Sequence, residues 1–469
     1  MDRRQFLSGL SNAAVLSLAA QAQDVQPIQI NIEPNRTLGA IPPDFTGLGY
    51  EISSVARPGL LSVTNRQYVQ LVRTLGTRGV IRIGGNTSDY SSFAPQGKAV
   101  SAPKATVINE ANLQELGTFL NATGWKLIWG LNLGSTNEQQ AIEEAQAVSA
   151  AAKGNLLAFE IGNEPDLFRQ EGHRPKGYSY DDYLKEYRLY KSAIRAKLPN
   201  ALFAGPDAAV QTEWVTRFAA DEGSDLKLLT HHYYRECASP TSTLDKLLHP
   251  DPRLAPELEK LKAALVSSRV PYRICETNSL CGGGKAGVSE TFGAALWVLD
   301  FMFRLAWGDC AGVNMETGVN QLGFISWYSP IGDDEHGHYM AKPEYYGMLT
   351  FTKASQGQRI ITDYDAAGAN LTAYAVLTSQ KRLLLTIINK EPFRHADVIV
   401  TTGQSIRNAD ALRLAGPSLE SKEGVTLGGA IVAPDGQWKP TTIETLRIQD
   451  RGCRLRVPAA SAALVRLQA

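Results

Sequence analysis

Eight short apolar runs, separated by longer amphipathic segments, fill residues 41 to 350 of this chain and constrain its fold most. Runs such as "VIRIGG" (80 to 85) have the length of buried strands, whereas "SYDDYLKEYRLYKSAIRAKL" (179 to 198) has the apolar spacing of a helix. The eight predicted strands cover residues 45 to 53, 80 to 85, 126 to 134, 156 to 164, 201 to 207, 226 to 234, 272 to 278 and 312 to 318. Repeated strand–helix alternation predicts a (β/α)₈ barrel over residues 41 to 350.

The competing architecture is a doubly wound open sheet. It needs a glycine-rich phosphate turn after its first strand, and "LGYEISS" does not supply one.

The pattern changes to alternation with a period of two from about residue 355, in "LTAYAVLTS", "RLLLTIINK" and "ADVIVTT". We therefore predict an all-β sandwich over residues 351 to 469. The early run "IQINIEP" (28 to 34) alternates in the same way and has no partner nearby in the sequence. We expect residues 24 to 40 to supply a strand to that distant sandwich.

The first 23 residues combine paired arginines, an apolar stretch and an A-x-A site, which together indicate an export signal. The start "RRQFL" resembles a twin-arginine signal, so we expect a bacterial protein that is periplasmic or secreted. No later run reaches transmembrane length, and a membrane is not an expected partner.

Charge and cysteine content exclude several classes of protein. Lys+Arg and Asp+Glu balance at 47 each in 469 residues, so no overall field attracts nucleic acid. The five cysteines are an odd number without C-x-x-C spacing. We therefore predict neither a disulfide framework nor a zinc site, and at least one free thiol.

Polar residues gather at the carboxyl ends of the predicted strands, where barrels carry their reactive groups. They include Glu51, Asn86, Asp89, Asn163, Glu164, His231, His232, Tyr233, Tyr234, Glu276 and Asn278. The two histidines are adjacent on one strand and point to opposite faces, so they cannot share a metal, and we interpret them as structural.

Glu164 and Glu276 end the fourth and seventh predicted strands. Pro165 holds Glu164 away from helical backbone angles, at the barrel mouth. Two carboxyls that face each other across a cleft can act as acid and nucleophile on a glycosidic bond, and a separation of about 5–5.5 Å gives retention of configuration. A single glutamate of this kind is more often only a surface charge, but the pair favours catalysis.

The motifs "RIGGNTSDYS", "GWKLIWGLNLG", "IGNEPDLF", "HHYY", "ETNS" with "GGK", and "PEYYGML" together resemble glycoside hydrolase family 79, the β-glucuronidase and heparanase family. The resemblance implies a barrel with a β-sandwich built partly from the N-terminal strand. It also implies that Glu164 is the acid/base and Glu276 the nucleophile.

The same resemblance implies roles for four further residues. Asn163 would bond the sugar 2-hydroxyl, Tyr233 would orient the nucleophile through its hydroxyl, and Glu51 and Asn86 would bond other sugar hydroxyls.

Two positions depart from the family pattern. Cys281 stands where the glucuronidases have a tyrosine that holds the sugar carboxylate, which leaves the backbone N–H of Gly283 and the hydroxyl of Tyr328 for that task. Glu316 stands where such relatives have a histidine. If Glu316 faces the pocket, its charge opposes a glucuronate; if it faces away, it is only a surface acid.

The sequence thus predicts a retaining exo-β-glycosidase that acts on a glycoside or oligosaccharide, with a β-glucuronide as the leading substrate, no cofactor and no metal. A neutral β-glycoside is the close alternative. A catalytically silent carbohydrate-binding protein on the same barrel is the alternative from another class.

Overall fold

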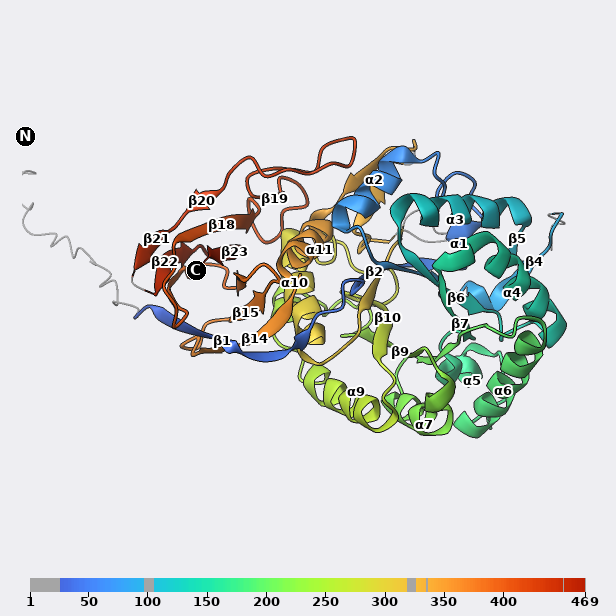
Figure 1. Cartoon of the computed structure of the whole chain (residues 1–469). Helices are drawn as coiled ribbons and strands as arrows, with labels where there is room; N and C mark the ends of the chain where they lie inside the picture. The colour runs from blue at the N-terminus through green and yellow to red at the C-terminus, as the bar shows by residue number, and fades with distance from the viewer. Residues whose placement is uncertain (1–25, 97–104, 319–325, 335, 450, 469) are drawn as a thin grey trace, which may run out of the picture.

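A barrel and a separate β-sheet domain lie side by side in the computed structural model of the chain (Figure 1). The structure describes residues 26–96, 105–318, 326–334, 336–449 and 451–468; the predicted export signal (1–23) lies outside these ranges. Among the described residues, no helix is both long and apolar enough to cross a bilayer.

Eight parallel strands form the barrel sheet, in the order β7-β6-β3-β2-β11-β10-β9-β8. Their bounds are Thr46–Glu51 (β2), Val80–Gly84 (β3), Lys126–Leu131 (β6), Leu156–Ile161 (β7), Ala204–Ala208 (β8), Leu228–Tyr234 (β9), Tyr272–Asn278 (β10) and Val313–Glu316 (β11). A bridge between Phe159 and Phe203 joins β7 to the start of β8 and closes the ring. All eight predicted strands and the barrel itself are confirmed.

Helices cover the outside of the ring and follow each barrel strand (Figure 1). They are α2 (Arg66–Leu75), α3 (Glu110–Thr123), α4 (Glu138–Ala152), α6 (Tyr180–Lys197), α7 (Thr212–Glu222), α9 (Leu254–Ser268), α10 (Phe292–Trp307) and α11 (Pro343–Ala354), with short helices α1 (Ile52–Val55), α5 (Phe168–Glu171) and α8 (Leu244–Leu248). Ser179 caps α6 by accepting from the backbone of Asp182, and Asn137 caps α4, because both side chains satisfy otherwise unpaired N–H groups. Two short strand pairs lie outside the ring: β4 (Ser91–Phe93) and β5 (Thr106–Ile108) run parallel, and β12 (Ile331–Asp333) and β13 (Tyr339–Ala341) run antiparallel.

The C-terminal domain is one mixed sheet in the order β19-β18-β23-β16-β15-β14-β1-β17-β22-β21, with β20 also paired to β18. Its strands are β14 (Gln358–Tyr364), β15 (Leu371–Leu377), β16 (Arg382–Asn389), β17 (Ala396–Thr401), β18 (Asn408–Ala415), β19 (Thr426–Leu427), β20 (Glu444–Thr445), β21 (Arg447–Gln449), β22 (Gly452–Val457) and β23 (Ser461–Gln468). Strand β22 contacts β16 and β23, so the sheet folds over as a sandwich around its own apolar core. The predicted boundary at residue 350 falls inside α11.

Strand β1 (Ile28–Ala40) joins the two ends of the chain in one sheet. It pairs antiparallel with β14 and parallel with β17, and Figure 1 shows it in blue along the orange and red sheet. Ile28, Ile30 and Ile32 are buried, whereas Gln29 and Asn31 between them are exposed. The expected N-terminal contribution to the sandwich is confirmed, because one apolar face of this strand needed a partner.

Backbone irregularities in two barrel strands aim side chains into the barrel. The pairing of β8 with β9 shifts between Pro206 and Ala208, and that of β10 with β9 shifts between Ile274 and Glu276. Such bulges break the alternation of a strand and turn consecutive side chains to one face. They allow Asp207, and both Cys275 and Glu276, to face the barrel interior.

Candidate active site

A pocket of about 910 Å³ opens at the carboxyl ends of the barrel strands. Its lining includes nine of the ten predicted site residues: Glu51, Asn86, Glu164, Tyr233, Glu276, Cys281, Gly283, Glu316 and Tyr328. The tenth, Asn163, is buried beside the pocket, where its side chain accepts from Arg82 at 2.8 Å. Sequence positions more than 270 residues apart therefore meet in one cavity because parallel strands end at one rim.

Glu164 and Glu276 face each other across this pocket. Together with His232, each offers an atom within 4.8 Å of the others. Glu164 has left-handed backbone angles, φ 53° and ψ 48°, directly before Pro165, so the expectation that the proline keeps it from right-handed helical angles is confirmed. A non-glycine residue in this region is strained by about 1–3 kcal/mol, which the surrounding structure must offset.

His232 bridges the pocket glutamate to a buried acid. Its Nδ1 lies 2.8 Å from Glu164 Oε1 and 3.8 Å from Glu276 Oε2, and its Nε2 lies 2.9 Å from Asp207 Oδ1. Burial lowers the pKa of His232, but the Asp207 and Glu276 carboxylates outweigh burial and raise it well above its usual value. His232 therefore contacts a pocket glutamate, which the interpretation as a purely structural residue did not include. His231 points to the opposite face, as expected, and its Nδ1 lies near the backbone of β8.

Arg82, in the middle of β3, lies at the base of the site and binds several of its polar side chains. Its guanidinium is fully buried and donates to Glu160 at 3.2 Å, Asp207 at 2.5 Å, Glu276 at 2.9 Å and Asn163 at 2.8 Å. Burial lowers the pKa of Arg82, but these carboxylates outweigh it and raise the pKa well above its usual value. One cation thus orients the nucleophile candidate and the residue before the acid candidate.

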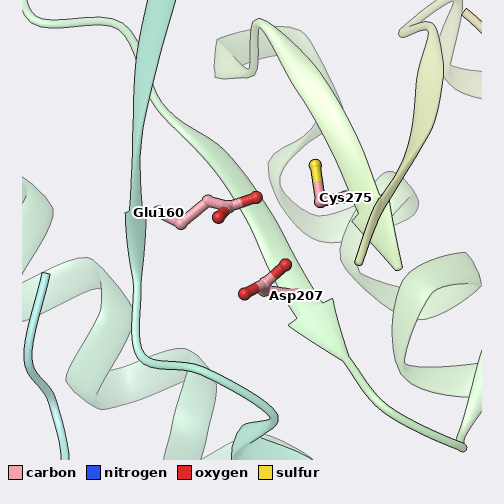
Figure 2. Close-up of side chains that lie close together, drawn as sticks. All are labelled: Glu160, Asp207 and Cys275. Atoms are coloured by element: carbon pink, nitrogen blue, oxygen red, sulfur yellow. The ribbon is translucent and has the colours of Figure 1, made fainter. Parts of the chain in front are cut away.

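Behind Glu164 and Glu276, three residues come together from β7, β8 and β10: Glu160, Asp207 and Cys275 (Figure 2). One atom of each lies within 4.8 Å of the others, a grouping that could in principle hold a metal ion. Arg82 already donates to both carboxylates, and His232 to Asp207. Because cationic side chains already balance these acids, we infer that the cluster stabilises the base of the pocket and does not bind a metal.

The expected contact of the Tyr233 hydroxyl with Glu276 is wrong; the Tyr234 hydroxyl makes that contact. The hydroxyl of Tyr234 donates to Glu276 Oε1 at 3.1 Å, whereas that of Tyr233 donates to Asp251 at 2.5 Å. Side chains alternate along β9, and since His232 points inward, Tyr234 does so as well. A motif without its register could not decide between adjacent tyrosines.

Cys281 has no free thiol, although the cysteine spacing indicated no disulfide framework. Cys281 forms a disulfide with Cys237, so a disulfide is present that the cysteine spacing did not predict. The two loops follow the adjacent strands β9 and β10, and the N–H of Cys281 donates to the carbonyl of Glu236. Cys275, Cys310 and Cys453 are free and buried, which confirms that at least one thiol is free.

Lys285 strengthens the same junction between the loops. Its ammonium donates to the carbonyls of Ser239, Pro240 and Ser242. The disulfide and the lysine therefore fix the loop that carries Gly283, whose carbonyl accepts from the backbone of Trp327 at 2.6 Å.

Glu316 faces the pocket, which decides the question that the sequence left open. It is 3% exposed, and a Cβ atom at Gly49 would lie 2.5 Å from its Oε2, so a side chain at Gly49 would require the Glu316 carboxylate to move. Tyr328 is buried beside it, and burial, with the charge of Glu316 second, raises the pKa of the Tyr328 hydroxyl well above its usual value. The carboxylate-binding side of the pocket predicted from the family thus contains an acid.

Glu51 and Asn86 lie next to each other in the pocket, at the carboxyl ends of β2 and β3. The carboxylate of Glu51 accepts from the backbone N–H groups of Asn86 and Thr87 and from the Thr87 hydroxyl. Burial, and then the charge of Glu276, raise the pKa of Glu51. Asn86 is exposed to the pocket and accepts from Asn163 at 3.4 Å.

Sequence reasoning missed Arg82 and Asp207, which support the pair, and it placed Tyr234 at a strand end without giving it a role. A signal for Arg82 was available, since it is a lone charge inside the apolar run "VIRIGG". A cation at an inward position of a buried strand requires buried anions nearby.

Comparison with known proteins gives relatives over most of the chain, although no protein-family model matches it. A β-glucuronidase from Aspergillus niger is 26% identical over 391 residues, covering 75% of this chain and 70% of the relative. A heparanase from Bos taurus is 27% identical over 261 residues, covering 52% of this chain and 45% of the relative. The chain is a relative of the glycoside hydrolase family 79 enzymes. This confirms the resemblance of the motifs, and it supports glycoside hydrolase activity.

Solved structures agree with the fold. A 4-O-α-L-rhamnosyl-β-D-glucuronidase from Fusarium oxysporum 12S, solved as a complex with Rha-GlcA, matches with a TM-score of 0.76 at 19% identity, covering 93% of this chain and 99% of that chain. An arabinofuranosidase matches with a TM-score of 0.72 at 13% identity, covering 94% and 100%. At these identities the likeness concerns the architecture.

The two adjacent tyrosines provide a direct test of the site. We expect Tyr234→Phe to lower kcat on a nitrophenyl β-glycoside by about 10- to 100-fold, because a hydrogen bond to a charged group contributes about 1.5–3 kcal/mol. Tyr233→Phe is the matched control and should lose less than about threefold, since its hydroxyl bonds Asp251. Equal losses in the two variants would contradict this assignment.

Proposed function

We propose that the protein is a retaining exo-acting β-glycosidase, most specifically a β-glucuronidase. The observation that carries the proposal is the facing pair Glu164 and Glu276, with atoms within 4.8 Å. Retaining glycosidases keep their two carboxyl groups about 5–5.5 Å apart, whereas inverting enzymes need about 6.5–9.5 Å to admit a water between them.

The surroundings of the two glutamates favour different roles. Glu276 accepts from Arg82 and Tyr234, which fix its carboxylate in one orientation for attack on the anomeric carbon. Burial raises the pKa of Glu164 to about 7, with the hydrogen bond from His232 opposing this rise. A carboxyl group that is protonated near neutral pH can donate a proton to the leaving oxygen and later accept one from water.

In this mechanism Glu276 displaces the leaving group and forms a covalent glycosyl-enzyme bond, while the Glu164 proton goes to the departing oxygen. Water then attacks the anomeric carbon from the side of Glu164, which takes its proton, and Glu276 leaves. Two inversions give net retention. Asn163, Glu51 and Asn86 would bond the sugar hydroxyls, as the resemblance implies.

The choice of a β-glucuronide follows from the relatives, two of which are named β-glucuronidases. The backbone of Gly283 and the hydroxyl of Tyr328 both line the pocket and can donate to a carboxylate. We expect an export route for the protein and no cofactor.

One observation favours a second candidate, a neutral β-glycoside. Glu316 lines the pocket near Tyr328, and Cys281 is held in a disulfide and has no thiol proton to donate. A carboxylate facing a sugar carboxylate is repulsive, whereas the same carboxylate can accept from a neutral sugar's hydroxyl.

The stereochemical outcome tests the mechanism. Proton NMR of the first product of nitrophenyl β-glycoside hydrolysis should show the β anomer, and Glu276→Gln should lower kcat by at least about 10³-fold because the nucleophile is lost. Glu257→Gln, which also alters a pocket carboxylate, is the control and should stay within about tenfold. Formation of the α anomer first would refute retention, and a fully active Glu276→Gln would refute the catalytic assignment.

The pH profile tests the role of Glu164. Because burial raises its pKa to about 7, the proton-donating form is lost as pH rises through that value, so kcat/KM on an alkyl β-glycoside should fall above about pH 7. A dinitrophenyl glycoside has a leaving group that needs no proton, and its kcat/KM should show a much weaker basic limb. Identical basic limbs for the two substrates would contradict the assignment.

The charge of Glu316 tests the choice of sugar. On a panel of nitrophenyl β-glucuronide, glucoside, galactoside and xyloside, Glu316→Gln should raise the ratio of glucuronide to glucoside kcat/KM by about tenfold or more, because it removes a like charge from the pocket. Glu257→Gln on the β9 side is the control and should leave that ratio about unchanged. An unchanged ratio in Glu316→Gln would show that this carboxylate does not act on the sugar.

A further inference from the structure

The rim of the pocket has a polar part and an apolar part. Around β2, β3, β10 and β11 it presents polar groups, among them Glu51, Asn86, Glu276 and Glu316. After β7 and β8 it presents Leu167, Ala209 and Val210, which we call the apolar lip. Val210 is 66% exposed, so the apolar lip presents an uncovered apolar side chain at the edge of the pocket.

The apolar lip is held in place by a buried acid. Asp166 is 2% exposed, and its carboxylate accepts from the backbone N–H groups of Ala209 at 2.8 Å, Val210 at 3.0 Å and Gln211 at 2.9 Å. These three hydrogen bonds connect the loop after β8 to the turn that carries Glu164 and Leu167. The lip is therefore a fixed part of the pocket.

The position of the lip relative to the catalytic pair defines what it can contact. A general acid lies beside the oxygen that it protonates, so the leaving group departs on the side of Glu164. Leu167 is three residues beyond Glu164, and β8 is the neighbour of β7 on the side toward β9. The lip thus lies where the leaving group must lie, and the polar rim lies on the side of the sugar.

We infer that the apolar lip is an aglycone subsite for an alkyl or aryl group, and not for a second sugar. This inference rests on the proposed function. The side chains of Leu167, Ala209 and Val210 have no hydrogen-bonding atoms, and the N–H groups of the last two already donate to Asp166. A sugar here would lose water from its hydroxyls without new partners, whereas an apolar group loses nothing.

On the β9 side of the pocket, several polar side chains of the adjacent wall are bonded within the protein. The Tyr233 hydroxyl donates to Asp251, Glu236 pairs with Lys246, and Arg253 donates to the carbonyl of Tyr234 at 2.8 Å. These groups line the pocket together with Glu257, and their bonds within the protein engage the Tyr233 hydroxyl, the Glu236 carboxylate and one nitrogen of Arg253.

A series of methyl, butyl and octyl β-glycosides of the preferred sugar tests the subsite, because these alcohols differ little in acidity and differ mainly in apolar surface. We expect kcat/KM to rise at least about tenfold from methyl to octyl, since each fully buried methylene contributes about fourfold. A disaccharide with the same sugar at its non-reducing end should be a poorer substrate than the octyl glycoside.

Val210→Asn should lower the octyl-to-methyl ratio by at least about threefold, because it places an amide on the lip. Val266→Asn is the matched control: Val266 is 72% exposed on α9, outside the pocket, and the ratio should not change. A flat alkyl series from an enzyme that hydrolyses nitrophenyl glycosides would overturn the subsite alone. A disaccharide faster than the octyl glycoside would do the same, and no turnover of any nitrophenyl glycoside would overturn both proposals.

Discussion

A guanidinium without solvent contact, that of Arg82, is the interaction on which the rest of the site depends. A buried cation is strongly destabilising unless anions surround it, and here Glu160, Asp207 and Glu276 do so. Those anions would in turn be unstable without the arginine. Strand β3 therefore fixes the positions of groups from β7, β8 and β10, and the barrel cannot close with these strands in another register without leaving charges unpaired.

From this centre, two lines of hydrogen bonds reach the pocket. One runs directly from Arg82 to Glu276, and the other runs through Asp207 and His232 to Glu164. The two glutamates therefore share a common support but differ in surroundings. Glu276 is bound by a cation and a phenol, while Glu164 stands on a strained turn where burial raises its pKa. Such a difference between paired carboxyls is what a division into nucleophile and proton donor requires.

The loops around the pocket are held by contacts separate from those that hold Glu164 and Glu276. The rim can therefore differ while these two glutamates keep their positions. The Cys237–Cys281 disulfide and Lys285 fix the loops after β9 and β10, and Asp166 fixes the loop after β8. None of these contacts passes through Arg82. Changes in the rim can therefore alter its shape and charge without moving Glu164 and Glu276.

The sequence alone determined the eight strands, the helices between them, the late change to a two-residue period and the place of both glutamates at strand ends, because these follow from local periodicity and chain direction. It did not determine which of Tyr233 and Tyr234 faces Glu276, that Cys281 meets Cys237, that Glu316 faces the pocket, or that Arg82 connects four strands. Each of these depends on register, on bulges at Asp207 and Cys275, and on which loops lie side by side. Only the closed barrel decides them, because a shift of one residue along a strand sends a side chain to the opposite face.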